Sequence, residues 1–413
     1  MKPILMPYEG RDVPHIVIEV NQTCNISCKA CYKDKSNFSK PLDEIRREVD
    51  LAMSKRNLML VSIAGGEPTL HPDLPEVIRY IAGKGLLVQL LTNGYDVPDS
   101  KWRQYKEAGL HGVFVHVDSL QNRPDREGMR TEADLHALRA RLAQQVTRHG
   151  LHCFLAYTIY RSNLDAFEDV VRFALRNPDL QRILAICYAD QNHIAGNLRK
   201  GDMLGVPVSR YTNRLEATVV LGRKSVDYES ENVTSAQVKA LLHEKLQMLP
   251  FAYIGSSKRD DEERWLFYYA FVITNPKKPV QQDSDVRVLH VGPAFGRLAR
   301  WTNDKARRKG KPYSFGVIMN PARAVLACSM YALTCGNLAE AGRTLWFLLH
   351  LLKPGTRLLQ KVFIVQQGPN VDADGELEYC KACPDATIRN GEMIPVCMAD
   401  IFSPVDQSVN VDE

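Results

Sequence analysis

The amino-acid sequence predicts an α/β fold built on a parallel sheet. From residue 15 to about residue 200, short apolar runs rich in β-branched residues alternate with longer stretches of helical periodicity. The chain has 413 residues, of which 45% are hydrophobic, so it can bury a large core and divide into two or three domains. Because crossovers between parallel strands are right-handed, such a chain forms an open doubly wound sheet or a barrel, with functional residues at the carboxyl ends of the strands.

Six strands with helices between them follow from this alternation. The expected strands are 15–20, 60–64, 87–91, 113–117, 153–159 and 183–188. The expected helices include 42–54, 74–83, 132–149 and 165–177. The periodicity is compatible with both an open sheet and a barrel, so by itself it leaves that choice open.

Beyond residue 194 the alternation stops, and glycine, proline and charged runs become frequent. We expect an accessory region here that contains a helix over 234–249 and strands over 265–274 and 286–291. The last hundred residues hold five of the ten cysteines and end in a polar tail. The predicted domains are therefore a core barrel over 1–194, an accessory insert over 195–312 and a cysteine-rich domain over 313–413.

Charge and hydropathy exclude several classes of protein. The net charge of +5 and the pI near 8.6 are modest for this length and do not require a nucleic-acid partner. The longest apolar stretch, Leu345 to Leu352, is far shorter than the about 20 residues that cross a bilayer, so we expect no transmembrane segment. Residues 297–311 hold seven Lys and Arg residues and one acidic residue, which could attract an anionic group, although a solvated face is the default. The absence of a signal-peptide pattern and the many cysteines predict the reducing cytoplasm.

Three cysteines, Cys24, Cys28 and Cys31, follow the first expected strand with the spacing C-x3-C-x2-C. Thiolates bind four-iron clusters, usually four at a time, so a group of three indicates either a distant fourth ligand or an iron that is left open for chemistry. A zinc site would show two cysteine pairs or a histidine pair, and no histidine lies in this group. A disulfide framework is typical of short secreted chains. The group therefore favours an iron–sulfur site.

Together with Tyr32 and the segment Gly65-Gly66-Glu67-Pro68 after the second strand, this cysteine group resembles the radical S-adenosylmethionine (SAM) superfamily. The resemblance implies a partial (β/α)6 TIM-like barrel, and so favours a barrel over an open sheet. It also implies that the three cysteines hold a 4Fe–4S cluster whose open iron chelates the amino and carboxylate groups of SAM. In that superfamily an aromatic often follows the third cysteine, and backbone groups of the glycine segment bind the SAM amino group.

Other residues at expected strand ends lie where this superfamily places contacts to the ribose and carboxylate of SAM. These residues are Asn93, Ser119, Arg161 and Asn163. Arg161 could pair with the carboxylate in bidentate fashion. Each residue also has a purely structural interpretation, because Asn-Gly is a turn dipeptide and Ser and Asn are capping residues.

Three residues inside expected strands have simpler interpretations. His116 could face the barrel interior, where we expect a histidine whose hydrogen bonds are satisfied rather than an acid or base. We interpret Cys153 and Cys187 as buried thiols without a chemical role.

The last hundred residues contain five cysteines, namely Cys328, Cys335, Cys380, Cys383 and Cys397. Cys335 with the Gly-Asn-Leu that follows it, and the C-x2-C pair at 380–383, resemble the SPASM and twitch domains, although the upstream cysteine of those domains is missing. The resemblance implies a C-terminal domain with one auxiliary 4Fe–4S cluster, for which Cys328, Cys380, Cys383 and Cys397 are the favoured ligands and Cys335 the substitute. A structural zinc is the main rival, because four thiolates also suit Zn²⁺.

These resemblances imply an enzyme that reductively cleaves SAM to a 5′-deoxyadenosyl radical and abstracts a hydrogen atom from its substrate, with the auxiliary cluster assisting. Dehydrogenation, epimerisation and bond formation all remain open, and no residue is assigned as a catalytic acid or base. Only fourteen residues precede the first strand, whereas peptide-modifying members commonly carry a leader-binding segment there. We therefore expect a small-molecule or lipid-like biosynthetic substrate, with a flavodoxin- or ferredoxin-type reductant. The alternatives are a maturase of a ribosomal peptide and a non-catalytic iron–sulfur redox protein.

Overall fold

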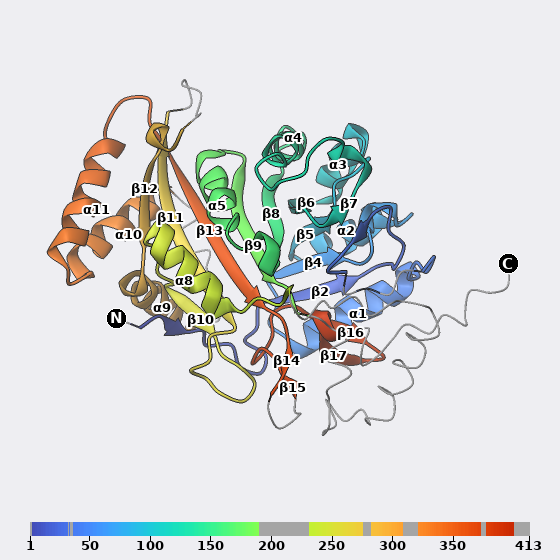
Figure 1. Ribbon diagram of the computed structural model, residues 1–413. Coiled ribbons are helices and arrows are strands. Elements are labelled where there is room, and N and C mark those ends of the chain that lie inside the picture. Colours follow the sequence, from blue (N-terminus) through green and yellow to red (C-terminus); the bar gives the residue numbers. More distant parts are fainter. Residues whose placement is uncertain are drawn as a thin grey trace, which may run out of the picture.

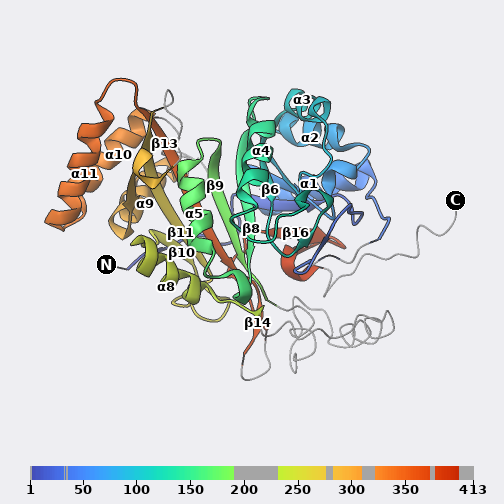
Figure 2. The same cartoon turned by 45° about the horizontal axis from the view of Figure 1, so that its top comes forward.

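The computed structural model describes residues 2–31, 33, 36–189, 231–275, 282–308, 321–372 and 377–399. Across these residues, eleven strands form one large sheet (Figure 1). Its strand order is β1-β10-β11-β13-β9-β8-β6-β5-β4-β2, and β12 also pairs with β11. In both views α1 to α4, the helices that follow β2 to β6, lie at one end of the molecule, and α9, α10 and α11 lie at the other (Figures 1 and 2).

Six parallel strands form the β2 end of the sheet, and they correspond to the six that the sequence predicts. They are β2 (His15–Glu19), β4 (Leu60–Ala64), β5 (Leu87–Thr92), β6 (Leu110–His116), β8 (His152–Ile159) and β9 (Leu180–Cys187). Every neighbouring pair is parallel. The arrangement confirms the predicted α/β fold with a partial-barrel sheet.

Five helices connect these strands, and the sequence predicts four of them. The predicted four are α1 (Leu42–Lys55), α2 (Leu74–Gly83), α4 (His136–Thr147) and α5 (Phe167–Arg176). The fifth, α3 (Asp99–Ala108), has a mostly polar sequence and buries only Trp102, Tyr105 and Ala108. So short an apolar stripe gives little periodic signal, which is why the helix was not predicted.

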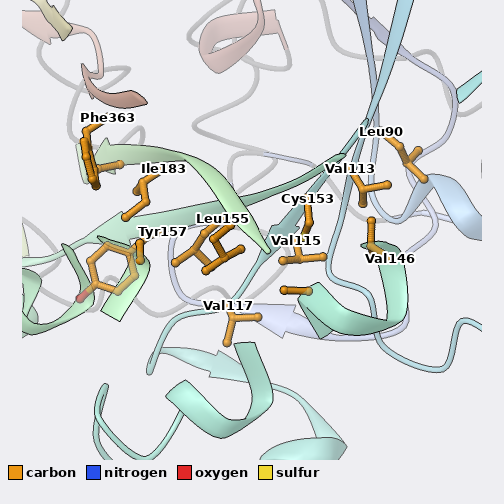
Figure 3. Close-up of a cluster of buried hydrophobic side chains, with 14 of the residues drawn as sticks. Leu90, Val113, Val115, Val117, Val146, Cys153, Leu155, Tyr157, Ile183 and Phe363 are labelled. Atoms are coloured by element: carbon orange, nitrogen blue, oxygen red, sulfur yellow. The ribbon is translucent and has the colours of Figure 1, made fainter. Parts of the chain in front are cut away.

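The side of the sheet that faces these helices forms the main core. Figure 3 shows part of it, where side chains of β5, β6, β8 and β9 pack together with Val146 of α4 and Phe363 of β13. Cys153 lies in this cluster, and Cys187 is also fully buried, which confirms that both are buried thiols. Because side chains alternate across a strand, Phe114, Phe154 and Leu184 face the opposite side and form a smaller apolar cluster there.

The same sheet continues beyond the parallel strands. β13 (Arg357–Gln367) pairs in parallel with β9 and antiparallel with β11 (Trp265–Thr274). The outer strands are β12 (Arg287–Val291), β10 (Ala252–Ile254) and β1 (Ile4–Leu5). The predicted strands of the accessory region are thus confirmed, as is its helix, α8 (Ser235–Leu246). One sheet therefore runs through all three predicted domains, and the boundaries at 194 and 312 stay a prediction.

Three helices cover the β12 end of the sheet. They are α9 (Pro293–Arg307), α10 (Pro321–Thr334) and α11 (Leu338–Leu351). α10 packs against both α9 and α11, and α11 also contacts β12. Among the described residues, no helix is long and apolar enough to cross a membrane.

The C-terminal segment packs against the first strand of the parallel sheet. It contains two short hairpins, β14 (Asn370–Val371) with β15 (Leu377–Glu378) and β16 (Ala386–Arg389) with β17 (Glu392–Pro395). Arg389 pairs with the buried Glu19 of β2 at 2.6 Å, and Lys33 pairs with the other oxygen of Glu19 at 2.8 Å. Burial alone would raise the pKa of Glu19, but the two cations hold it below its ordinary value. A buried salt bridge therefore links the β16–β17 hairpin to β2.

Arg389→Met should lower the free energy of unfolding by about 3 kcal/mol, because it leaves a buried carboxylate with one partner fewer. Urea denaturation at neutral pH would measure the loss. Since the folded pKa of Glu19 is depressed, the stabilisation is present above the ordinary value of 4.5 and disappears as pH falls through the folded value. Arg79→Met, which removes an exposed pair with Glu76, is the control. Equal stability of the two variants would contradict the assignment.

Candidate functional site

The cysteine loop, defined here as residues 24–31, lies beyond the carboxyl end of β2. Within it, β3 (Ser27–Cys28) pairs with β7 (Gln121–Asn122), which belongs to the segment after β6. Cys24 and Cys28 are half-buried, Cys31 is exposed, and none of the three forms a disulfide bond. The three predicted ligands therefore lie together at the edge where the parallel strands end, as the sequence indicates.

Contacts from two further strand ends hold the cysteine loop. Asn93, which follows β5, donates from Nδ2 to Oδ1 of Asn25 at 2.8 Å. The hydroxyl of Tyr160, which follows β8, accepts a hydrogen bond from the backbone N–H of Ala30 at 3.1 Å. Together with the β3–β7 pairing, these contacts tie one loop to the ends of β5, β6 and β8. Asn25 and Tyr160 could not be identified from the sequence, because neither stands out from its neighbours without the fold.

Gly66, at the end of β4, allows a close approach between two backbone segments. Its N–H donates to the carbonyl of Asn21 at 2.9 Å, and the next N–H, that of Glu67, donates to the carbonyl of Thr23 at 2.7 Å. A Cβ at Gly66 would lie 2.3 Å from the Thr23 carbonyl oxygen, which is closer than any real contact. Glycine is therefore required here to position the chain that leads into the cysteine loop.

The Glu67 side chain is fully buried and hydrogen-bonded within the protein. One oxygen accepts from the hydroxyls of Thr69 and Thr92, both at 2.6 Å, and the other accepts from the N–H of Asn93 at 2.8 Å. The carboxylate thus links the end of β4 to the end of β5. This makes Glu67 a positioning residue, and the predicted SAM contact of Gly65 to Pro68 rests on their backbone groups.

Ser119 and Asn163 lie close together because both bond to one carboxylate, that of Glu132. The Ser119 N–H and the Asn163 Nδ2 donate to the same oxygen, at 2.9 and 3.0 Å. Asn163 Oδ1 also accepts from the N–H of Tyr160, so its amide is used in the turn after β8. The sequence analysis placed Glu132 at the start of a helix and did not recognise this role, although its buried partner Arg139 lies seven residues later.

Arg161 is exposed in the same turn, which spans Arg161–Asn163. Its guanidinium stands at the carboxyl end of β8, where a ligand could reach it. Tyr32 lies outside the described residues. The SAM contacts predicted for Tyr32, Asn93, Ser119, Arg161 and Asn163 therefore stay predictions.

His116 ends β6, and its ring is hydrogen-bonded. Nε2 lies 3.0 Å from Oδ2 of Asp118 and 3.0 Å from the hydroxyl of Thr158. The Asp118 side chain is fully buried, whereas that of the histidine is 29% exposed. The satisfied histidine that the sequence predicts is present, but it lies at the rim of the barrel rather than in the core.

The donor set of the cysteine loop suits an iron–sulfur cluster. Among the described residues, no three His, Cys, Asp or Glu side chains lie close enough to hold a single metal ion. A four-iron cluster takes one thiolate per iron, so its ligands are spaced more widely than those of a single ion. Three cysteines outside any disulfide, on a loop that is fixed from several strand ends, fit that requirement, and Cys24, Cys28 and Cys31 would hold the cluster.

Cys380, Cys383 and Cys397 gather in the C-terminal segment. Contact with Cys380, burial and the nearby Cys397 raise the pKa of the Cys383 thiol. The indole N–H of Trp265 donates to the sulfur of Cys380 at 3.1 Å, and the Arg56 guanidinium donates to the carbonyl of Cys383 at 2.8 Å. Three of the five predicted auxiliary ligands therefore lie near one another, with Cys380 and Cys383 buried and Cys397 half-buried.

The other two predicted ligands, Cys328 and Cys335, lie at α10. Burial raises the pKa of the Tyr269 phenol, and the nearby Cys328 raises it further. Burial also raises the pKa of Cys328 itself, to about 12. Tyr269 is four residues along β11 from Trp265, which corresponds to roughly 13 Å. Cys328, near Tyr269, and Cys380, which bonds to Trp265, therefore lie at two separate positions along β11. Which residue completes the auxiliary site stays a prediction.

The structure thus combines a parallel, partial-barrel sheet with a three-cysteine loop that is fixed to its strand ends. Residues 18–174 match the family described as "Radical SAM superfamily". The match covers all six of the parallel strands of the β2 end except β9 and the start of β2.

Several curated proteins are similar to part of the chain. The "7,8-dihydro-6-hydroxymethylpterin dimethyltransferase" of Methanocaldococcus jannaschii is 30% identical over 114 residues, which are 26% of this chain and 22% of that protein. The "Fe-coproporphyrin III synthase" of Methanosarcina barkeri is 30% identical over 166 residues, 39% of this chain and 40% of that protein. The "Probable GTP 3',8-cyclase" of Pyrococcus abyssi is 34% identical over 121 residues, 28% and 38% respectively. The chain thus spans less than half the length of each of these relatives.

Two solved structures show weaker similarity. "Crystal structure of Streptococcus suis SuiB" has a TM-score of 0.35 at 17% identity and covers 52% of this chain and 48% of that one. "Native anSMEcpe with bound AdoMet" has a TM-score of 0.35 at 17% identity, with 58% and 69% covered. Neither similarity is strong enough to transfer a property to this chain.

Gly66→Ala should displace the chain before the cysteine loop, because the new methyl group meets a backbone carbonyl that cannot move aside. We expect a folded protein whose iron content after anaerobic reconstitution and whose affinity for SAM both fall, the latter about tenfold or more. Gly83→Ala is the matched control, since a Cβ there meets nothing within 4 Å. Full iron content and unchanged SAM affinity in Gly66→Ala would contradict the assignment.

Proposed function

We propose that this chain is a radical SAM enzyme. Cys24, Cys28 and Cys31 bind a 4Fe–4S cluster through three irons and leave the fourth for the amino and carboxylate groups of SAM. When bound, the cluster and SAM supply an electron and a 5′-deoxyadenosyl radical that abstracts a hydrogen atom from the substrate. The observation that supports the proposal most directly is that hydrogen bonds hold the cysteine loop to the residues that follow β5, β6 and β8.

The contacts of the strand ends indicate how the protein would contribute. Glu67 and Asn93 fix two strand ends relative to each other, and Asn93 also holds the cysteine loop. The cluster ligands and the binding surface for SAM would therefore move as one rigid body. Such rigidity matters because a reacting carbon must be held within contact distance of the hydrogen that it abstracts. Arg161, exposed at the end of β8, would pair with the SAM carboxylate.

We further propose an auxiliary 4Fe–4S cluster in the C-terminal segment. Cys380, Cys383 and Cys397 would supply three of its ligands, and Cys328 or Cys335 the fourth. The proposal is supported by two buried thiols and one half-buried thiol that lie near one another beside the cationic Arg264 and Arg56, which would stabilise thiolates. The chemical rival is zinc, which thiolates also bind, but no three of the described side chains lie close enough to hold a single ion.

For the substrate, we propose a small molecule or a lipid-like molecule that is consumed in a biosynthetic step. The relatives that match the domain are named for a pterin, a porphyrin and a nucleotide. A flavodoxin- or ferredoxin-type protein would reduce the cluster. Modification of a ribosomal peptide is the alternative, and a non-catalytic redox protein would bind iron without cleaving SAM.

Replacing Cys24, Cys28 and Cys31 together with Ala should remove about half of the iron and acid-labile sulfide per chain and abolish formation of 5′-deoxyadenosine. Iron and sulfide assays after anaerobic reconstitution, with chromatography of the SAM products, would measure both. Cys153→Ala with Cys187→Ala, two buried thiols outside both sites, is the control. Wild-type protein that binds iron but never cleaves SAM under reduction would favour the redox protein.

Cys380→Ser with Cys383→Ser should remove the other half of the iron and leave SAM cleavage by the first cluster measurable. Metal analysis by mass spectrometry separates the rival: zinc in the wild-type protein that the double variant loses, with iron unchanged, would contradict an auxiliary cluster. The thermal unfolding midpoint of the same samples distinguishes loss of a cluster from loss of the fold.

A further inference from the structure

An unusually apolar surface lies at the β12 end of the molecule. Among the described residues, nine of the twelve large hydrophobic side chains that are exposed belong to residues 301–352. They are Trp301, Val325, Leu326, Leu333, Leu338, Leu345, Trp346, Leu349 and Leu352. We call the set the α10–α11 surface, although Trp301 belongs to the neighbouring α9. Exposed apolar groups that gather on one face of a protein mark an interaction site, whereas single ones need no explanation.

Helix α11 is apolar on two faces, and only one of them is used inside the protein. Thr344 and Phe347 are buried, and Phe347 packs in an apolar cluster with side chains of β11 and β12. Leu338, Leu345, Leu349 and Leu352 follow one another at spacings of seven, four and three residues, which places them along one helix face. Their exposed fractions run from 56% to 93%. Packing inside the protein therefore does not explain why these four exposed leucines lie along one face of α11.

The two exposed tryptophans of the chain both belong to this surface. Trp301 is 59% exposed and Trp346 is 51% exposed, whereas Trp102 and Trp265 are buried. The Lys305 ammonium lies over the ring of Trp301, and the Arg287 guanidinium lies over the ring of Trp346. An indole ring beside a cationic side chain suits the boundary between water and lipid. The ring can contact the apolar layer while the charged group stays hydrated.

The part of the sequence that carries the surface is strongly basic. Residues 293–357 contain eleven Lys and Arg residues and only two acidic residues, an excess of nine that exceeds the +5 of the whole chain. Both acidic side chains have partners, since Asp304 lies near Arg300 and Glu340 accepts from Tyr331. Basic residues that flank an exposed apolar helix favour an anionic partner surface, and they disfavour a second copy that would bring the same charge.

We propose that the α10–α11 surface docks on an anionic lipid bilayer, with α11 lying in the plane of the interface. Leucine and tryptophan side chains enter the boundary between head groups and acyl chains, and the surrounding Lys and Arg residues pair with lipid phosphates. In both views α11 is at the edge of the molecule, with no other labelled element outside it (Figures 1 and 2).

The docking face lies apart from the cysteine loop. α11 contacts β12, which pairs with β11 at one end of the sheet, whereas the cysteine loop follows β2 at the other end. Membrane contact would therefore leave the strand ends that hold the predicted cluster accessible. The proposal does not rest on the proposed function, and its test needs no turnover.

Vesicle flotation of the full reconstituted chain tests the proposal. The probes are vesicles of phosphatidylcholine alone and of phosphatidylcholine with phosphatidylglycerol, at rising salt concentration. We expect binding to the anionic vesicles, little to the neutral ones, and weaker binding as salt screens the charges. The emission of Trp301 and Trp346 should shift to shorter wavelength on binding, and Trp346→Phe should reduce the shift.

Leu345→Glu with Leu349→Glu should weaken partitioning by about tenfold or more, because two side chains no longer enter the apolar layer. Leu87→Glu, at an exposed leucine of β5, is the matched control and should bind as wild type. Arg343→Glu with Lys353→Glu tests the charge without altering the leucines, and Arg103→Glu is its control.

Three results would overturn the proposal. They are no binding to anionic vesicles, equal binding by the leucine variant and wild type, and self-association in sedimentation that the leucine variant abolishes while vesicles stay unbound. The last would assign the surface to a second copy of the chain. If the leucine variant does not fold, unchanged binding by the charge variant overturns the proposal in the same way.

Discussion

The cysteine loop has no regular structure of its own apart from two residues of β3, so its shape depends on the hydrogen bonds that reach it from other strands. β7 pairs with Cys28, Asn93 bonds to Asn25, and Tyr160 bonds to Ala30. Each of these partners follows a parallel strand at its carboxyl end. A loop that must present three thiols in a fixed arrangement requires this support, because loop residues pay a large entropy cost when they are ordered.

The continuity of the large sheet also constrains the position of the C-terminal segment. β13 enters between β9 and β11, so residues near the C-terminus complete the structure that the N-terminal strands begin. The same segment then returns to β2, where Arg389 meets the buried Glu19 and Arg56 bonds to the carbonyl of Cys383. Lys33, two residues after the cysteine loop, pairs with the same glutamate. The cysteine loop and the C-terminal cysteine segment are thus joined through one buried carboxylate.

The parallel strands could be predicted because each is a short apolar run between helical periods, and that pattern is local. α3 could not, since its polar sequence buries only three side chains, and the place of β13 in the sheet could not, because pairing partners are set by the whole fold. The three cysteines and Gly66 were found by spacing and by chemistry. Asn25, Glu132 and Tyr160 were missed because a residue that supports a site carries no motif, and its role exists only once distant strand ends are brought together.

The proposed function requires that one iron of a cluster held by Cys24, Cys28 and Cys31 binds SAM directly. Electron paramagnetic resonance of the reduced Cys380→Ser/Cys383→Ser protein, with and without SAM labelled with ¹⁷O in its carboxylate, tests it most directly, because only the first cluster contributes to the signal. The account predicts that SAM changes the spectrum and that the label adds a hyperfine coupling to the cluster. A cluster signal that SAM leaves unchanged, with no coupling to the label, would contradict it.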